Sequence, residues 1–599
     1  MERVADYLIK ALHDAGIEHI FMVTGRGNLF LSDAVAKEDG LCAVPTYHEQ
    51  GASYAAIAYA LSKGGLGACL VSTGCAATNA MTAALCAWQD NLPVGFISGQ
   101  NMLRETTAFT GLPIRTYGSQ ETDILPMVRP ITKYAVMLQR PVDIAYELEK
   151  ALFLARFGRR GPVWIDIPLD VQNMRIAPET LARFKPCFVT SQDSVWKREA
   201  AWTAQELSHA ERPVLLLGGG SRIAQSEVMQ LVERVHIPVV FTPAAADVYG
   251  AGQPLSIGAV SSLGGSRAGN FALQNADYIL AIGTKLCSQM TGNDMDSFAR
   301  AADITIVDID PLEHTKQGEP TARHVQADAG TFLSRLLEED LQEVRLLWRE
   351  KCVAWKETFA ISEETFVKDS KAKDEIDLYQ LADALSTLLP DGATVITDAG
   401  FEELIVPSSV RFHDGQRCLF PAAQGAMGYA IPAILGAYFA GRKHIVCVVG
   451  DGSIMMNVQE LQAIRQHEIP AKILVINNDM YAVIRKRQKD LFRRRTIGTG
   501  NADGVSSPDF QKIANAFDFQ YRKIERLSEM GAQLKMLLQE DGPVLCEILC
   551  TQEQKYLHQS YGVDENRHLV QHPLEDLSPF MEREKLAREM LIPLWKGKK

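Results

Sequence analysis

The stretch VVGDGSIMMNVQELQAIRQHEIPAKILVINND, residues 448–479, decides the fold of the C-terminal third of the chain. It completes the apolar run HIVCVV, which is typical of a strand buried on both faces, and AKILVI predicts the next strand. Between them we expect a turn at 450–453 and a helix over 457–467. A right-handed crossover would place two such parallel strands side by side, with their carboxyl ends at one crevice. The stretch therefore predicts a parallel α/β sheet with a binding site at this edge.

The turn of this stretch combines two features that conflict. Glycines suit the approach of a phosphate to backbone amides, here those of Gly452 and Ser453, yet the carboxylate of Asp451 lies between the glycines. Asn477 and Asn478 end the second strand and should lie beside Asp451. A hard cation such as Mg²⁺ resolves the conflict, because it binds one or two side-chain oxygens and completes its octahedron with ligand phosphates. We therefore predict a site for a metal diphosphate.

Alternating helical and β-type segments extend over most of the 599 residues, which predicts three α/β domains with parallel sheets. The first covers residues 1–180, the central one 195–345 and the third 365–552. Residues 553–599 read as a docking tail.

Composition narrows the function classes. The net charge of −12 and the pI near 5.6 give no reason to expect a nucleic-acid or membrane partner. Eleven cysteines without a CxxC pair argue against a disulfide framework or a zinc site. The N-terminus reads as an amphipathic helix ending at Gly16 rather than a secretory signal, so we expect a cytoplasmic protein.

The spacing of GDG, 24 residues, then NN resembles the thiamine diphosphate signature. A bare GDGS could equally be a structural turn, but the asparagine pair after a strand favours the cofactor site. The resemblance implies that Asp451, Asn478 and the backbone carbonyl of Met480 bind the metal, while Asn477 shapes the turn.

Thiamine chemistry needs an acid that protonates the aminopyrimidine ring, and Glu49 in TYHEQGASYAAIAYAL is the candidate. Alone, it could be a first-turn glutamate stabilised by the helix dipole. However, HEQGA, VSTGCAATN and DNLPVGFISGQ resemble the pyrimidine-binding domain of acetolactate synthase and pyruvate oxidase. In that family the acid and the diphosphate loop come from different subunits. The resemblance thus implies a homodimer or homotetramer with shared sites.

The same resemblance assigns further residues. Met427 would be the apolar wedge that bends the cofactor, although a methionine in a Gly/Ala-rich segment can simply fill a gap. The carbonyl of Gly425 would hold the exocyclic amine, Gln100 would close the pyrimidine pocket, and Gln120 would act near the reacting centre. The remaining cofactor-binding positions are Gly400, Gly450, Gly452, Ser453 and Asn478.

Several segments, among them GSQETDILPMVRPITKYAV and PLEDLSPF, resemble acetolactate-synthase-like proteins found with surface-polysaccharide genes. Some of these add a two-carbon unit from pyruvate to a keto-sugar nucleotide. Ser119 stands where synthases usually have Phe, which suggests a larger or more polar acceptor. Phe401 and Glu402 replace polar, non-acidic residues near the diphosphate, and a carboxylate there is unfavourable unless it faces away.

Two segments leave alternatives open. The run RKRQKDLFRRR, residues 485–495, has seven basic residues of eleven and is either a solvated face or a surface for an anionic acceptor. In the central domain, LLGGGSRI and AIGTKLCSQMTG correspond to segments that hold FAD in synthases. Lys285 replaces an arginine there and the dinucleotide fingerprint is absent, so FAD stays open.

The sequence therefore predicts a thiamine-diphosphate- and Mg²⁺-dependent enzyme that decarboxylates pyruvate or a close 2-oxo acid and ligates the two-carbon unit to a second carbonyl. Three alternatives remain: transfer to a keto-sugar nucleotide, a 2-oxo acid oxidase or decarboxylase, and an inactive regulatory homologue.

Overall fold

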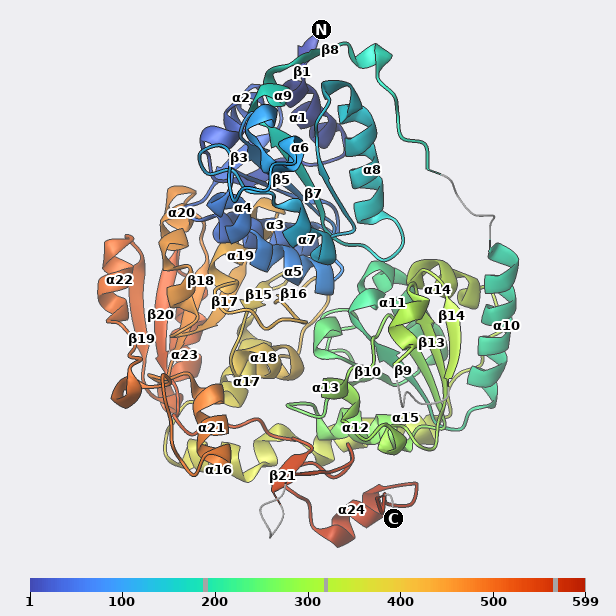
Figure 1. Ribbon diagram of the computed structural model, residues 1–599. Helices are drawn as coiled ribbons and strands as arrows, with labels where there is room; N and C mark the ends of the chain where they lie inside the picture. The colour runs from blue at the N-terminus through green and yellow to red at the C-terminus, as the bar shows by residue number, and fades with distance from the viewer. Residues whose placement is uncertain (187–191, 317–321, 564–568, 598–599) are drawn as a thin grey trace.

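The computed structural model describes residues 1–186, 192–316, 322–563 and 569–597. Three lobes are visible, each built on a six-stranded parallel sheet with helices around it (Figure 1). The prediction of three α/β domains with parallel sheets is confirmed. The boundaries near residues 180 and 365 stay predictions.

The N-terminal sheet has the order β3-β2-β4-β5-β7-β6. Its central strands are buried along their whole length, as expected where helices cover both faces. The strands are β2 (His19–Met22), β3 (Cys42–Pro45), β4 (Gly67–Val71), β5 (Val94–Gln100), β6 (Tyr134–Met137) and β7 (Val163–Pro168), and β1 (Glu2–Arg3) pairs with β8 (Arg175–Ile176). The α-helices are α1 (Val4–Asp14), α2 (Leu29–Lys37), α3 (Glu49–Lys63), α4 (Cys75–Asn79), α5 (Met81–Gln89), α6 (Thr107–Thr110), α7 (Leu125–Val128), α8 (Ile144–Arg156) and α9 (Leu169–Asn173).

The central sheet has the order β11-β10-β9-β12-β13-β14. Its strands are β9 (Pro213–Leu217), β10 (Val239–Phe241), β11 (Ser256–Ala259), β12 (Tyr278–Ile282), β13 (Asp303–Asp308) and β14 (Ala322–Gln326). The α-helices are α10 (Asp193–His209), α11 (Gln225–Val235), α12 (Arg267–Asn275), α13 (Ser288–Thr291), α14 (Ala329–Leu337) and α15 (Leu346–Thr358), and α16 (Thr365–Ala372) leads to the third lobe.

The C-terminal sheet has the order β16-β15-β17-β18-β20-β19. The two strands predicted from HIVCVV and AKILVI are β17 (Ile445–Gly450) and β18 (Lys472–Asn477), which are parallel neighbours as predicted. The other strands are β15 (Thr394–Thr397), β16 (Arg417–Leu419), β19 (Gln520–Ile524) and β20 (Val544–Leu549). The α-helices are α17 (Leu378–Leu388), α18 (Glu402–Ser409), α19 (Ala430–Phe439), α20 (Leu461–Gln466), α21 (Ala482–Leu491), α22 (Phe510–Ala516) and α23 (Leu527–Leu537).

The N-terminal and C-terminal lobes meet where α3 packs against α19, at the centre of Figure 1. Small side chains let the two helices approach closely: a Cβ at Gly436 would lie 2.1 Å from the carbonyl oxygen of Ala55. The buried carboxylate of Glu460 accepts hydrogen bonds from the backbone N–H groups of Tyr47 and His48, at 3.0–3.2 Å. The turn that precedes α3 is therefore held by the C-terminal lobe of the same chain.

The segment after residue 552 lies beneath the central lobe in Figure 1. It contains the hairpin β21 (Tyr561–Val563) with β22 (Leu569–Gln571) and the helix α24 (Arg583–Glu589). The carboxylate of Glu589 accepts hydrogen bonds from Lys351 at 2.6 Å and Trp355 at 3.0 Å, both on α15. The buried Arg267 donates to the carbonyl of Leu577 at 3.1 Å. These contacts dock the tail on the central lobe.

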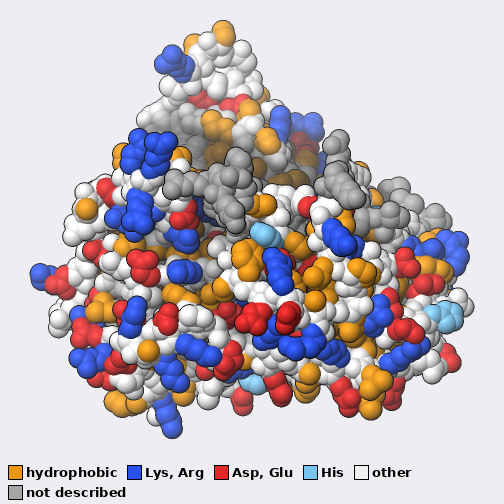
Figure 2. Space-filling view, turned by 90° about the horizontal axis from the view of Figure 1, so that it is seen from below, with side chains coloured by type: hydrophobic (Ala, Val, Ile, Leu, Met, Phe, Trp, Pro, Cys, Tyr) orange, Lys and Arg blue, Asp and Glu red, His pale blue; other side chains and the backbone are white. Residues whose placement is uncertain are grey.

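The ten cysteines in the described part of the chain are all free. In that same part, no helix has the length and apolar character needed to cross a membrane. On the face seen in Figure 2, Lys and Arg side chains are interspersed with Asp and Glu rather than gathered in one patch.

Candidate functional site

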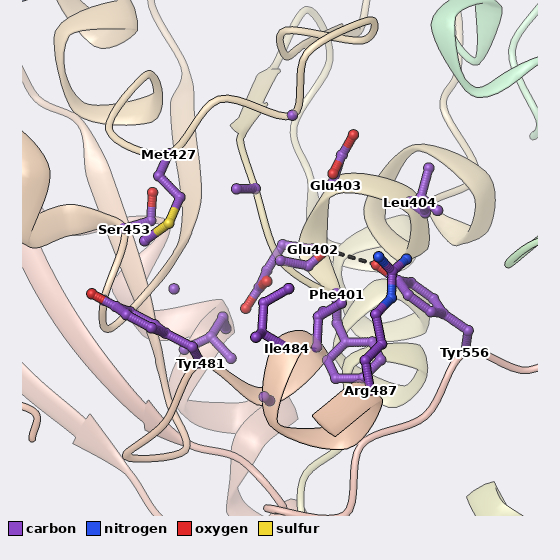
Figure 3. Close-up of a pocket in the computed structure, with 18 of the residues that line it drawn as sticks. Phe401, Glu402, Glu403, Leu404, Met427, Ser453, Tyr481, Ile484, Arg487 and Tyr556 are labelled. Atoms are coloured by element: carbon purple, nitrogen blue, oxygen red, sulfur yellow. Dashed lines mark hydrogen bonds between the residues drawn. The ribbon is translucent and has the colours of Figure 1, made fainter. Parts of the chain in front are cut away.

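A cavity of about 580 Å³ opens where β15, β17 and β18 end (Figure 3). It lies at the carboxyl edge of a parallel sheet, as predicted. Nine residues predicted as cofactor or metal ligands line it: Gly400, Gly425, Met427, Gly450, Asp451, Gly452, Ser453, Asn478 and Met480. The structure thus brings together the C-terminal half of the predicted site.

Asp451 is buried and its carboxylate is held by short bonds. One oxygen accepts from the N–H of Gly452 at 2.7 Å, and the other from the N–H of Asp479 at 2.8 Å and the hydroxyl of Ser507 at 2.8 Å. The N–H of Asn478 also approaches this second oxygen, at 3.2 Å. Burial raises the pKa of Asp451 above its usual value despite these donors. The carboxylate is therefore fixed in place, and burial destabilises its negative charge, which a bound cation would offset.

The side chain of Asn478 completes this arrangement. Its Oδ1 is buried and has no hydrogen-bond partner among the described residues, which is unusual for a buried carbonyl oxygen. Asn477, in contrast, donates to Glu547 at 2.6 Å and accepts from the N–H of Asp479 at 3.0 Å. This agrees with the prediction that Asn477 shapes the turn and leaves Asn478 for a ligand.

No cluster of three His, Cys, Asp or Glu side chains suited to a metal exists in the described part of the chain. A cation at Asp451 would need amide, carbonyl and ligand phosphate oxygens, which is the donor set that Mg²⁺ prefers. The residues present fit a Mg²⁺ diphosphate.

The helix predicted over 457–467 is wrong in its first half. The 3₁₀ turn Val458–Glu460 precedes α20, and another 3₁₀ turn, Ile454–Met456, follows the glycines. The cause is Asn457, whose side chain donates to the carbonyl of Gly428 at 2.8 Å and to Gln50 at 3.0 Å and so departs from the helix. The amides of Gly452 and Ser453 therefore lie before a 3₁₀ turn rather than at an α-helix N-terminus.

Two carboxyl groups of α18, those of Glu402 and Glu403, also line the cavity, beside Gly400, Gly450 and Gly425. Glu402 lines the cavity and is only 4% exposed, so it does not face away. Burial, together with the neighbouring Asp398, Asp451 and Glu403, raises its pKa to about 8. Burial likewise raises the pKa of Glu403 to about 7. Near neutral pH, Glu402 is mainly a neutral acid that can donate a hydrogen bond.

The other three predicted residues, Glu49, Gln100 and Gln120, are not among the residues that line this cavity. Glu49 begins α3 and accepts a hydrogen bond from Asn79 at 2.9 Å, at the end of α4. The backbone of Gln120, with φ of +64°, lies against Gly74 at the start of α4, where a Cβ would be 2.2 Å from the Gln120 carbonyl oxygen. The short helix α4 thus places Glu49 and Gln120 in one region of the N-terminal lobe.

Gln100 belongs to the same region. It ends β5, is buried, and donates to the carbonyl of Thr122 at 2.8 Å and to Asp166 at 3.1 Å. The next residue, Asn101, donates to the carbonyl of Ser119 at 2.8 Å. Gln100 therefore anchors the segment that carries Gln120.

Several cavity residues were not predicted. Tyr481 follows the Asn pair, and its ring lies so close to Gly452 that a Cβ there would be 2.0 Å from a ring carbon. Tyr556 of the tail donates its hydroxyl to the carbonyl of Gly400 at 2.8 Å (Figure 3). Other lining residues that were not predicted are Ser262, Leu263 and Glu403, whereas Ser288 and Gln289 belong to the segment AIGTKLCSQMTG and Arg487 to the basic run 485–495. Proximity to the Asn pair could have indicated Tyr481, whereas no sequence signal indicates Ser262 and Leu263.

Comparison with known proteins shows the family of the chain. Models of the thiamine pyrophosphate enzyme match in chain order: the N-terminal TPP binding domain at residues 2–127, the central domain at 200–336 and the C-terminal TPP binding domain at 398–548. An acetolactate synthase of Arthrospira platensis is 30% identical over 91% of this chain and 94% of its own length. This chain belongs to the acetolactate-synthase-like family of thiamine diphosphate enzymes. The large subunit of acetolactate synthase isozyme 2 from Escherichia coli is also 30% identical, over 91% of this chain and 95% of its length. The chain is thus a thiamine-diphosphate-dependent enzyme of the carboligase/lyase type.

The glycines of LLGGGSRI and AIGTKLCSQMTG, the two segments for which FAD was left open, have a structural role. The N–H of Gly220 donates to the carbonyl of Gly283 at 2.9 Å, and a Cβ at Gly218 would lie 2.2 Å from that oxygen. These glycines let two loops pack together, which explains them without a flavin. Whether FAD binds stays open.

Proposed function

We propose that this enzyme binds thiamine diphosphate through Mg²⁺ in the cavity beside Asp451, decarboxylates pyruvate or a close 2-oxo acid, and ligates the two-carbon unit to a second carbonyl. The observation that carries the proposal is the unpartnered, buried Oδ1 of Asn478 beside the fixed carboxylate of Asp451. Both are oxygen ligands at the mouth of a turn suited to phosphate. When bound, the thiazolium ring of the cofactor accepts the electrons released as the 2-oxo acid loses CO₂.

In this proposal, Asp451, Asn478 and the carbonyl of Met480 hold the metal. Gly450, Gly452, Ser453 and Gly400 border the diphosphate. Gly425 and Met427 face the organic part of the cofactor, and the thioether of Met427 is the apolar support. All these residues lie in the wall of one cavity.

Glu49 would exchange a proton with the aminopyrimidine ring, and Gln100 and Gln120 would border that ring and the reacting centre. Because these three residues do not line the cavity of their own chain, they would serve the cavity of a second subunit. Exposed apolar side chains near them support such an interface: Tyr47 is 59% exposed, and Phe109, Leu112, Ile114 and Tyr117 in the segment before Gln120 are also exposed.

The test is to incubate the protein with pyruvate, thiamine diphosphate and Mg²⁺, measure CO₂ release, and identify products by mass spectrometry. We expect a ligated product such as acetolactate. Acetaldehyde alone, or acetyl phosphate with peroxide, would indicate a decarboxylase or oxidase instead. Absence of pyruvate-dependent CO₂ would contradict the proposal.

A further inference from the structure

Arg487 is the one basic residue among those that line the cavity in the described part of the chain. It is carried by α21, and it shares a face of that helix with Val483 and Ile484, four and three residues earlier, which also line the cavity. Figure 3 shows the side chain of Arg487 reaching from α21 toward Tyr556. The cavity wall otherwise carries the acidic Glu402, Glu403 and Asp451.

The other basic residues of the run 485–495 are placed differently. Arg485 pairs with Asp503 at 2.9 Å, and Lys486 pairs with Asp490 at 2.6 Å, both away from the cavity lining. Arg493 lies beyond the end of α21, is exposed, and is not among the lining residues. The run therefore separates into surface charges and one arginine at the cavity.

Arg487 makes no ion pair with any residue in the described part of the chain. Its influence on nearby acids is electrostatic, since it lowers the pKa of Glu403 against the effect of burial. The side chain is exposed, so it stands at the opening, where a substrate from solvent would meet it. Its guanidinium has donors arranged in a fork that matches a carboxylate or a phosphate.

Arg487 lies apart from Met427 and Ser453, two of the residues expected to face the cofactor. In Figure 3, Met427 and Ser453 lie on one side of the cavity, and Arg487 and Tyr556 lie on the other. Tyr556 donates to the carbonyl of Gly400, so this side of the cavity adjoins the expected border of the diphosphate, and the exposure of Arg487 leaves its guanidinium accessible to a further anion from solvent.

We propose that Arg487 recognises the anionic group, a carboxylate or a phosphate, of the acceptor that receives the two-carbon unit. This inference rests on the carboligation proposed above and adds the chemical class of the acceptor. Arg487 acts in it as a specificity-determining residue that touches the substrate.

The experiment compares wild type with Arg487→Gln and Arg487→Lys, each loaded with thiamine diphosphate and Mg²⁺ and saturated with pyruvate as donor. Three acceptors are tested: 2-oxobutyrate for a carboxylate, dihydroxyacetone phosphate for a phosphate, and acetaldehyde as the uncharged reference. In Arg487→Gln we expect the KM of one anionic acceptor to rise about tenfold or more, as for loss of a charge-assisted hydrogen bond. The KM of acetaldehyde and CO₂ release from pyruvate should stay unchanged. Arg487→Lys should recover part of the loss, and the penalty should shrink at high salt.

The matched control is Arg493→Gln, which removes the same charge from the same run outside the cavity. Equal KM changes in Arg487→Gln and Arg493→Gln would overturn the inference, because only long-range attraction would remain. Weaker binding of thiamine diphosphate in Arg487→Gln with no change in any acceptor KM would also overturn it and assign the arginine to the cofactor.

A binding measurement separates failure of this inference from failure of the proposed function. If wild type releases no CO₂ from pyruvate, the proposed function fails. Calorimetric titration of the loaded protein with dihydroxyacetone phosphate and with oxamate, an unreactive carboxylate analogue of pyruvate, then tests Arg487 by itself. Binding of one anion that weakens about tenfold in Arg487→Gln supports the inference. Absence of binding to wild type, or equal affinity in both proteins, overturns it.

Discussion

Replacing Glu402 with glutamine should change how cofactor affinity depends on pH. Glu402 lies in the wall beside the glycine turn, is 4% exposed and has a pKa of about 8. As a neutral acid it can donate a hydrogen bond to a phosphate oxygen, whereas as a carboxylate it would repel the diphosphate. Its favourable form is therefore present below pH 8 and is lost as the pH rises through 8.

The size of the effect follows from this pKa. If only the protonated form accepts the diphosphate, the Kd of thiamine diphosphate is multiplied by about 1.1 at pH 7 and about 11 at pH 9, a difference of about 1.4 kcal/mol. The Glu402→Gln variant is neutral throughout and still carries a donor. We expect it to match wild type at pH 7 and to keep that affinity at pH 9.

Calorimetry at saturating Mg²⁺ between pH 7 and 9 measures the Kd of thiamine diphosphate and the number of protons taken up on binding. In wild type, binding at pH 9 should also take up about one proton, which shows when buffers of different ionisation enthalpy are compared. Glu403→Gln is the control, because a pKa of about 7 for Glu403 places its own titration lower. Parallel losses of affinity in wild type and Glu402→Gln would refute the reasoning, as would the absence of any loss in wild type.

The remaining predictions concern residues assigned from the sequence. Glu49→Gln should keep cofactor affinity but lose about 10²–10⁴-fold in turnover; near wild-type CO₂ release would remove Glu49 from the mechanism. Asp451→Ala should weaken thiamine diphosphate binding in Mg²⁺ by at least about tenfold, because it deletes a hard ligand, and unchanged calorimetric affinity would contradict the metal site. Ser119→Phe should shift products toward small acceptors such as pyruvate, since the ring fills space beside Gln120; unchanged ratios in competition with a larger acceptor would argue against that pocket.

The part of the site near Asp451 was predictable because it depends on two strands and a turn that are close together in the sequence. HIVCVV and AKILVI are apolar throughout, which fixes them as buried parallel strands, and a right-handed crossover then brings their ends together. The bond from the Asn478 N–H to Asp451, at 3.2 Å, is the direct result. The same reasoning failed for the helix over 457–467, because Asn457 is bonded to Gln50 and Gly428, which are distant in sequence.

The direction in which a side chain points was harder to predict than its element. Glu402 lies on a helix whose first turn could present a carboxylate to either solvent or the sheet edge, and only the packing of α18 turns it into the cavity. The basic run contains seven basic residues, of which the sequence favoured Arg493, Arg494 and Arg495 as contacts of an anionic acceptor; the structure instead places Arg487, one helical turn after Ile484, at the cavity. The composition of the run thus indicated a basic segment, but the orientation of α21 relative to the sheet decides which of its arginines faces the cavity.

Contacts between lobes set the limit of prediction from sequence. Glu460 follows the glycine turn at 450–453 by a few residues, yet its carboxylate accepts hydrogen bonds from the N–H groups of Tyr47 and His48, immediately before Glu49. A Cβ at Gly51 would lie 2.4 Å from the same carboxylate, so the glycine is required for this approach. Within one chain, Glu460, which follows the glycine turn of the cavity, thus positions the backbone that leads into Glu49, the predicted acid. If that acid serves the cavity of a second subunit, Glu460 links the geometry of the two cavities, because a shift of the turn at one would move Glu49 toward or away from the other.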